Sequence, residues 1–172
     1  MDQVRDKNIE TGKALDLGCA VGRSSFELAR YFQHVDAVDF SARFIQQGVK
    51  LQSSNRLRYT LPVEGDIVEY REVLLDKMGY DDVKDRIQFL QGDACNLKPE
   101  LTDYNVVFAG NLIDRLYEPK LFLDSITQRI LPGGLLVLTS PYTWLEEYTD
   151  KENWLGGTKV NGENFSTLDA LK

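Results

Sequence analysis

Two glycines and an acidic residue with fixed spacing are the residues of this sequence best suited to chemistry. Asp16, Gly18 and Gly22 lie in residues 14–23, which predict a short buried strand, a tight turn and the start of a helix. Glycines at such a turn let the main chain approach a ligand that a Cβ would hold away. The helix start aims backbone N–H groups at the same place. This stretch therefore predicts a binding turn.

The spacing of the turn excludes two phosphate motifs. Gly18 and Gly22 are four residues apart, unlike the G-x-G-x-x-G of a dinucleotide site, and no Lys-Ser/Thr pair of a P-loop follows. Asp16 would repel a pyrophosphate and attract a cation. The turn therefore favours a ligand with an ammonium or sulfonium group, although Asp16 could also serve only as a cap.

Two further acids follow predicted strands. Asp39 comes at the end of the second strand, where it could accept hydrogen bonds from two ribose hydroxyls. Asp93 follows the third strand and could accept from an adenine amino group, while the Ala94 N–H faces a ring nitrogen. The alternative for each acid is a solvated turn residue. With Asp16, they favour an adenosine ligand with a cationic tail.

The elements that position these acids alternate between strands and helices. Strands are predicted at 13–17, 35–40, 86–90, 104–109 and 135–139, with helices from Gly22, from Ser41 and from Pro119 to about Ile130. Apolar strands separated by helices predict an α/β fold with a mostly parallel twisted sheet, helices on both faces and a site at the carboxyl ends of the strands.

Some segments depart from this alternation. An inserted β-hairpin is predicted near 56–73, and residues 131–134 are predicted to end the preceding helix before the last strand begins. The inner face of the second helix is predicted to comprise Phe44, Ile45, Gly48 and Val49. Ser166 is predicted to open a last helix with a capping box.

Composition limits the function classes. The chain has 172 residues and a net charge of -7, which argues against general nucleic-acid binding. Its apolar runs are too short to span a membrane, and no signal peptide opens it. Cys19 and Cys95 suit small apolar packing in a reducing compartment, so a cytoplasmic location is predicted. We predict one domain over 1–172, without a metal site.

As a set, D-x-G-x-x-x-G, the acid after the second strand and G-D-A resemble the class I S-adenosylmethionine-dependent methyltransferases. The resemblance implies a Rossmann-like fold, S-adenosylmethionine as cofactor and S-adenosylhomocysteine as product. The cofactor-binding residues it implies are Asp16, Gly18, Cys19, Ala20, Gly22, Arg23, Asp39, Phe40, Asp93, Ala94 and Asn111.

A closer resemblance covers nearly the whole chain. LDLGCAVGRSSFELAR, VDFSARFI, QGDACNL, NLIDRL, LPGGLL and SPYTWLEEYT resemble the carboxy-terminal methyltransferase module of the ovothiol biosynthesis enzyme family. This resemblance implies N-methylation of the imidazole of 5-mercaptohistidine, with an iron-dependent sulfoxide synthase domain as fused or separate partner. The histidines of that domain and the usual last two strands of the sheet are missing, so a truncated C-terminal end is expected.

Four residues are predicted to act on the acceptor. Asn111 leaves the fourth strand beside the expected methyl position. Asp114 and Arg115 could match the ammonium and carboxylate of an amino acid, or form a surface ion pair. Tyr142, like Trp144, could stack on an imidazole or serve only in packing.

Two other functions stay open at this point. One is methylation of another small molecule, and the other is a non-catalytic S-adenosylmethionine-binding module. A nicotinamide-dependent reductase is disfavoured by the glycine spacing.

Overall fold

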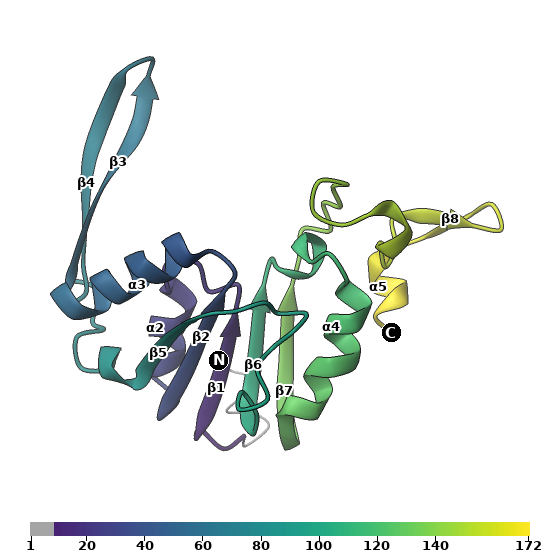
Figure 1. Cartoon of the computed structure of the whole chain (residues 1–172), viewed down its shortest axis with the longest axis horizontal. Helices are drawn as coiled ribbons and strands as arrows, with labels where there is room; N and C mark the ends of the chain where they lie inside the picture. Colours follow the sequence, from purple (N-terminus) through teal and green to yellow (C-terminus); the bar gives the residue numbers. More distant parts are fainter. Residues whose placement is uncertain (1–8) are drawn as a thin grey trace.

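A five-stranded parallel sheet forms the centre of the molecule. The structure, a computed structural model, describes residues 9–172, and its sheet has the order β5-β2-β1-β6-β7 (Figure 1). The strands are β1 (Lys13–Leu17), β2 (His34–Asp39), β5 (Ile87–Gln91), β6 (Tyr104–Gly110) and β7 (Ile130–Thr139). All four pairings are parallel, which confirms the predicted α/β class.

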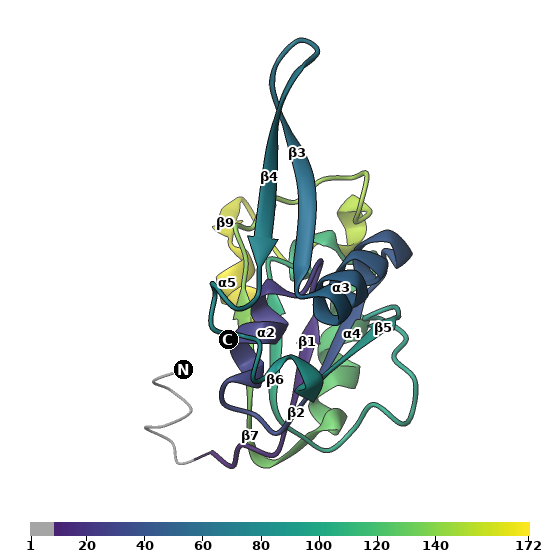
Figure 2. The same cartoon turned by 90° about the vertical axis from the view of Figure 1, so that its left-hand side faces the viewer.

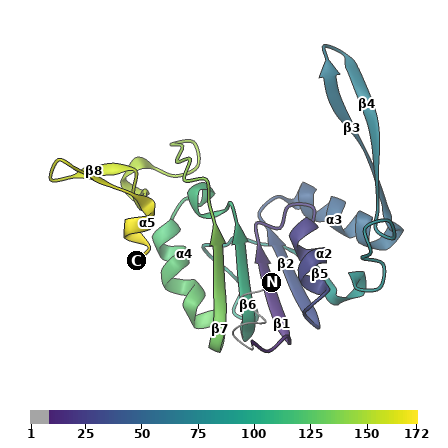
Figure 3. The same cartoon turned by 180° about the vertical axis from the view of Figure 1, so that it is seen from behind.

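Helices cover both faces of this sheet. The longer ones are α2 (Arg23–Ala29), α3 (Ala42–Ser54) and α4 (Pro119–Ile126), with a short α5 (Thr167–Ala170) near the carboxyl end. Four 3-10 turns complete them: η1 (Lys84–Arg86), η2 (Ile113–Arg115), η3 (Thr127–Arg129) and η4 (Lys151–Asn153). In the view from behind, α2 and α4 lie over different ends of the sheet (Figure 3). Between residues 9 and 172, no helix has the length and apolarity needed to cross a bilayer.

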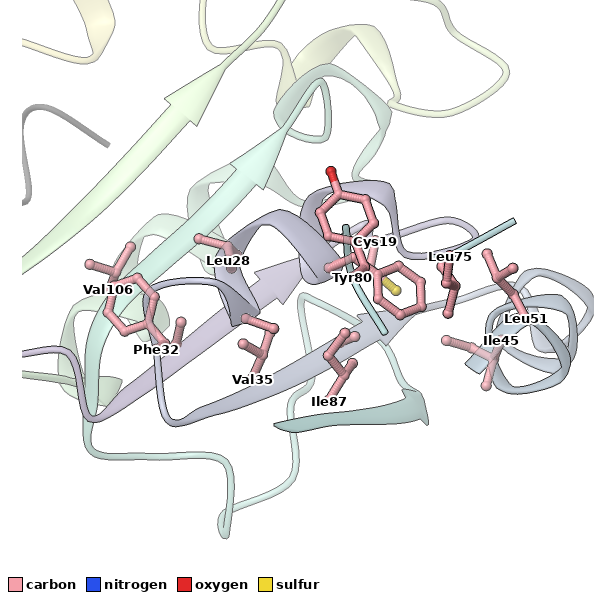
Figure 4. Close-up of a cluster of buried hydrophobic side chains, with 14 residues drawn as sticks. Cys19, Leu28, Phe32, Val35, Ile45, Leu51, Leu75, Tyr80, Ile87 and Val106 are labelled. Atoms are coloured by element: carbon pink, nitrogen blue, oxygen red, sulfur yellow. The ribbon is translucent and has the colours of Figure 1, made fainter. Parts of the chain in front are cut away.

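Two hydrophobic clusters lie on opposite faces of the sheet because side chains alternate along each strand. On one face Ala14 and Val35 pack with residues of α2 and α3 (Figure 4). On the other face Leu15 and Val107 pack with Phe122 of α4. Parallel strands buried on both faces are what the near-continuous apolar runs predicted.

The predicted inserted hairpin is present. It consists of β3 (Arg56–Glu64) and β4 (Ile67–Leu74), paired antiparallel through the turn at Gly65. The hairpin projects away from the sheet beyond the end of α3 (Figure 2). Most of its side chains are exposed, including Tyr70, which is 82% exposed.

Four local predictions are corrected by the structure. The strand predicted to begin at 135 begins at Ile130, so residues 131–134 lie within β7. A register shift between Tyr104 and Val106 accommodates the extra residues as a bulge. The predicted helix to Ile130 ends at Ile126 and continues as η3. On α3, Ile45 and Gly48 are buried as predicted, but Phe44 and Val49 are almost half exposed, and Leu51 takes the inner position instead.

The last correction concerns the carboxyl end of the chain. A small hairpin of β8 (Thr158–Val160) and β9 (Glu163–Phe165) was not predicted, because its strands are short and largely polar. The capping box at Ser166 is confirmed, since its side chain accepts from the Asp169 N–H and Asp169 bonds back to Ser166.

Candidate functional site

The register of the sheet brings the predicted acids to one edge. Leu17 of β1 pairs with Val38 of β2 on one side and with Ala109 of β6 on the other. The residues that follow these three positions are Gly18, Asp39 and Gly110, so they leave the sheet side by side. The next strand, β5, ends at Gln91, opposite Asp39. Since β1 lies between the two halves of the sheet, this edge is the topological switch point.

A cavity of about 620 Å³ lies at this edge. Its wall combines the glycine turn, the ends of β2, β5 and β6, and the segments after β6 and β7. The lining residues used below are Gly18, Ala20, Asp39, Phe40, Asp93, Ala94, Asn111, Arg115, Tyr117, Glu147 and Tyr148.

Asp39 ties the end of β2 to the glycine turn. Its Oδ2 accepts the backbone N–H of Ala20 at 2.9 Å, and its Oδ1 accepts the N–H of Ser41 at 2.8 Å. Ala20 is held in the left-handed region with φ 49°. A carboxylate has about four acceptor positions, so Asp39 keeps capacity for two donors from a ligand in the cavity.

Four N–H groups of the glycine turn are used within the protein, so the turn offers a ligand fewer donors than the sequence predicted. The N–H groups of Gly18 and Cys19 both donate to the carbonyl of Val38, at 2.9 and 3.2 Å, and that of Gly22 donates to Cys19. With the Ala20 N–H held by Asp39, these donors are used within the protein. These four donors are therefore not available to a phosphate, in keeping with a ligand that is not bound through phosphate.

Asp16 lies beneath this turn and is fully buried. Its Oδ2 accepts from the hydroxyls of Ser24 and Ser25 at 2.7 and 2.6 Å, whereas its Oδ1 is buried and has no partner among residues 9–172. Burial raises the pKa of Asp16 to about 6, against the opposing hydrogen bonds from the two serines. At neutral pH the group is thus a poorly compensated negative charge, placed behind Gly18 rather than in the cavity wall.

Asp93 and Ala94 form the adjoining part of the wall. Asp93 Oδ1 accepts the Cys95 N–H at 2.9 Å, and its Oδ2 accepts the hydroxyl of Tyr117 at 2.8 Å. This hydrogen bond to Asp93 raises the pKa of Tyr117 to about 12. The backbone N–H of Ala94 donates to no atom of residues 9–172. One acceptor and one donor therefore lie next to each other, as adenine recognition requires.

Asn111 follows β6 and lines the same cavity. Its backbone takes the left-handed conformation with φ 53°, and its N–H donates to the carbonyl of Thr139 at 2.8 Å. The side-chain oxygen accepts from the Thr139 hydroxyl at 3.4 Å. The side-chain NH₂ makes no hydrogen bond within the part of the chain that the structure describes, so it can donate to a ligand.

Asp114 lies outside the cavity, in a closed network. It is fully buried, and it accepts hydrogen bonds from Ser140, Arg115 and both the N–H and hydroxyl of Thr143. Burial acts to raise the pKa of Asp114, but the hydrogen bonds from Ser140 and Thr143 outweigh it and hold that pKa below its ordinary value. Asp114 thus joins η2 to the segment after β7 and is not free to meet an acceptor.

Arg115 belongs both to this network and to the cavity wall. Its guanidinium donates to the carbonyl and hydroxyl of Thr143 at 2.7 and 2.8 Å and lies 5.1 Å from the centre of the Tyr148 ring. The Nε–H makes no hydrogen bond with the described residues, so Arg115 still has a donor for a ligand.

Other predicted residues lie away from this cavity. Cys19 is buried in the hydrophobic cluster between α2 and the sheet, where burial raises the pKa of its thiol and keeps it protonated. At Gly22 an added Cβ would meet the ring of Phe89, and Arg23 points towards Met78 and Tyr80. Tyr142 is exposed and does not line the cavity.

Trp144, offered with Tyr142 as a stacking residue, is used in packing. It stacks on Trp154 with ring centres 6.2 Å apart, and its Nε1–H donates to the Thr167 hydroxyl at 2.8 Å. Its ring therefore helps to attach α5 to the segment after β7.

Among the lining residues that were not predicted to bind, three carry a hydroxyl or a carboxylate: Tyr117, Glu147 and Tyr148. Tyr117 precedes α4, and the other two follow β7, so all three come from irregular segments. The run of acids and aromatics after β7 was the only signal available for Glu147 and Tyr148.

Together, the strand order and a site built from the ends of β1, β2, β5 and β6 define the fold of class I S-adenosylmethionine-dependent methyltransferases. The chain belongs to the methyltransferase domain family, which matches residues 10–167. No curated protein sequence matches the chain significantly.

Solved structures agree with this fold. An S-adenosylmethionine-dependent methyltransferase from Clostridium acetobutylicum superposes with a TM-score of 0.59 at 15% identity, over 95% of this chain and 54% of that one. A glycopeptide N-methyltransferase complexed with sinefungin gives 0.56 at 20% identity, over 82% and 53%. The YcgJ protein of Bacillus subtilis gives 0.57 at 12% identity, over 80% and 48%. The chain thus spans about half the length of the structures it matches.

The cofactor that this fold and family imply is S-adenosylmethionine, and the residues at the site fit it. Asp39 has acceptor capacity for two hydroxyls, and Asp93 with the Ala94 N–H offers an acceptor beside a donor. Asp16 has a buried oxygen with no partner in the described part of the chain, which suits a nearby positive charge.

Proposed function

We propose that this chain binds S-adenosylmethionine at the carboxyl edge of its sheet and methylates an imidazole nitrogen of 5-mercaptohistidine. The observation that carries the cofactor part is the convergence of Asp39, Asp93 and Asn111 on one cavity beside Gly18. The acceptor part rests on the resemblance of NLIDRL and SPYTWLEEYT to the ovothiol enzymes, and on the charges described below.

In this proposal each wall of the cavity holds one part of the cofactor. Asp39 accepts from the ribose hydroxyls, while Asp93 and the Ala94 N–H meet the edge of the adenine. Asn111 offers its side-chain NH₂ at the end of β6, where it would hold the amino-acid portion or the acceptor. Asp16, ionised above its pKa of about 6, attracts the positive charge through the turn.

The bound cofactor supplies an electrophilic methyl group on a sulfonium, so no strong base is needed for attack by neutral imidazole. The contribution of the protein is then alignment and exclusion of water. It must also present nitrogen rather than the softer sulfur of a mercaptohistidine, which makes orientation of the ring the main task.

Two charged residues in the wall support an amino-acid acceptor. Arg115 has a free Nε–H for a carboxylate, and Glu147 lines the same cavity with an exposed carboxylate for an ammonium group. Glu147 takes the role that the sequence assigned to Asp114, whose carboxylate is buried and fully bonded. The Tyr148 ring, already next to Arg115, provides an aromatic face for the imidazole.

The test is a methyl-transfer assay with a matched pair of acceptors. The chain is incubated with S-adenosylmethionine and either 5-mercaptohistidine or histidine, and products are followed by mass and by carbon–proton NMR. We expect one added methyl on a nitrogen of 5-mercaptohistidine and one equivalent of S-adenosylhomocysteine. Methylation at sulfur, or transfer only to an unrelated acceptor, would refute the proposed acceptor.

The matched variants are Arg115→Lys and Lys120→Gln. Arg115→Lys keeps the charge but loses the planar donor set, and we expect the KM for the acceptor to rise at least tenfold. Lys120 is an exposed residue of α4 outside the cavity, so its variant should match the parent chain.

A further inference from the structure

A second and larger cavity lies between α2, α3 and the base of the β3–β4 hairpin. Its volume is about 880 Å³. Among its lining residues, only Phe44 also lines the cofactor cavity. The proposed methyl transfer does not use this second cavity, which we call the hairpin cavity.

The floor of the hairpin cavity is apolar and well packed. Tyr80 and Phe26 are almost completely buried, and their rings stack with centres 5.7 Å apart. Leu75 and Leu51 extend the same surface, and the close-up shows them gathered with Tyr80 beside α3 (Figure 4). Met78 completes the floor. Such a surface suits the flat or apolar body of a ligand.

Two arginines at this cavity have no anionic partner. Arg43 makes no hydrogen bond or ion pair with any residue from 9 to 172, and Arg23 meets only the Met78 sulfur and the face of Tyr80. All other arginines in that range bond to or pair with an oxygen: Arg30, Arg56, Arg58, Arg71, Arg86, Arg115 and Arg129. The two exceptions line the same cavity.

Arg23 and Arg43 lack an anionic partner among residues 9–172 even though the chain is acidic. With 27 acidic against 20 basic residues, a carboxylate is the commoner neighbour for a guanidinium. Arginine also pairs with carboxylate and phosphate groups through two parallel hydrogen bonds. Two unpaired guanidiniums above an apolar floor are therefore complementary to a ligand that is anionic at one end and apolar at the other.

We propose that the hairpin cavity binds a small organic anion with an aromatic body. The aromatic body lies on the partly exposed Leu57, Val73 and Met78, which pack over the buried Tyr80. The anionic group meets Arg43 and Arg23. This site is separate from the methyl-transfer site, so a ligand bound there would act as an effector or as a second ligand, not as the methyl acceptor.

The chain offers a specific reporter for this site. Met78 is the only methionine besides Met1, so labelling of methionine methyl groups gives a Met78 NMR signal that can be assigned with Met78→Leu. The probes are naphthalene-1-acetate and its neutral amide, which have the same ring system. We expect a saturable shift of the Met78 signal with the carboxylate, and at least tenfold weaker binding of the amide.

The decisive variant is Arg43→Gln, because Arg43 is exposed and makes no hydrogen bond or ion pair with residues 9–172 that the variant would remove. We expect it to weaken binding of the carboxylate at least fivefold and to change binding of the amide less than twofold. Lys50→Gln is the control, since it removes the same charge from an exposed position of α3 outside the cavity.

The proposal is overturned if the carboxylate gives no saturable shift of Met78, if the amide binds equally well, or if Arg43→Gln and Lys50→Gln behave alike. Titration of S-adenosylmethionine into the same samples keeps the two sites apart. A chain that binds the cofactor but not the naphthalene carboxylate contradicts only the hairpin cavity, and the reverse result contradicts only the methyl-transfer site.

Discussion

Asp39 Oδ2 accepts the backbone N–H of Ala20 at 2.9 Å, across the gap between the ends of β1 and β2. This bond holds a non-glycine residue in the left-handed region within the turn that forms one wall of the cavity. Asp39 therefore has two tasks, since it shapes the turn and faces the cavity with its remaining acceptor positions. Asp16 and Asp93 likewise combine bonds within the protein with a place at or behind this cavity.

Asp16 should make the stability of the protein depend on pH between about 4 and 6. Its folded pKa of about 6 is above its usual value of 3.8, so the folded state binds more protons in this window and the free energy of unfolding falls as pH rises. Relative to Asp16→Asn, the parent should lose about 2 kcal/mol between pH 4 and pH 7. Chemical denaturation at a series of pH values measures this difference.

If the free energies of unfolding of the parent and of Asp16→Asn differed by the same amount at every pH in that range, the assignment of a buried, poorly compensated carboxylate would be contradicted.

Asp16→Asn should also weaken the binding of S-adenosylmethionine more than the binding of S-adenosylhomocysteine. The sulfur of S-adenosylmethionine is a positively charged sulfonium, whereas that of S-adenosylhomocysteine is neutral. The ratio of the two dissociation constants, measured by calorimetry at pH 7.5, tests this.

Asp114 should have the opposite effect to Asp16, because its contribution to the free energy of unfolding falls as the pH is lowered. Its pKa is lowered in the folded state, so the stability it contributes is present above its unfolded pKa and is lost as pH falls below about 4. Asp114→Ala removes the partner of Arg115 and Thr143 and should cost about 3 kcal/mol at pH 7. Thermal unfolding measures the loss. Asp124→Ala, which removes an acid from α4 outside this network, should cost under about 0.5 kcal/mol.

Tyr117→Phe should strengthen cofactor binding by about two- to fivefold, which is under about 1 kcal/mol. The hydroxyl of Tyr117 occupies Asp93 Oδ2 at 2.8 Å, where an adenine amino group would compete with it. Because the pKa of Tyr117 is about 12, the effect should be the same at pH 6 and pH 9. Calorimetry with Tyr70→Phe as control measures it, and a tenfold loss of affinity would show that the hydroxyl holds the ligand instead.

Gly22→Ala should destabilise the protein by about 3 kcal/mol. Gly22 has φ 95°, and a Cβ there would lie 2.5 Å from the Phe89 ring, which itself packs against Phe26. Gly65→Ala is the matched control, because the hairpin turn has positive φ but open space around it, and it should cost about 1 kcal/mol. Chemical denaturation measures both free energies of unfolding, and an equal loss in Gly22→Ala and Gly65→Ala would refute a packing role for Gly22.

The sequence predicted the fold well because its signals are local and repeated. Apolar strands, caps such as Ser41 and the hairpin turn each follow from a few neighbouring residues. Asp39 and Asp93 could also be placed, since strand ends in a parallel sheet meet at one edge.

The rest of the site depends on packing that a linear pattern does not contain. Arg23 is next to the glycine turn in sequence, yet as the first residue of α2 it points to Tyr80 and away from the cofactor cavity. Asp114 is polar and adjacent to Arg115, but Thr143, 29 residues away, closes over it. Tyr117 and Tyr148 reach the cavity from irregular segments, where no periodicity predicts direction.

The most direct test of the central claim is a calorimetric titration of S-adenosylmethionine into the parent chain, Asp39→Asn and Asp82→Asn. We predict saturable one-to-one binding to the parent, unchanged binding to Asp82→Asn, whose acid is exposed and outside the cavity, and at least a hundredfold weaker binding to Asp39→Asn. Absence of binding to the parent, or equal affinity for both variants, would contradict the account.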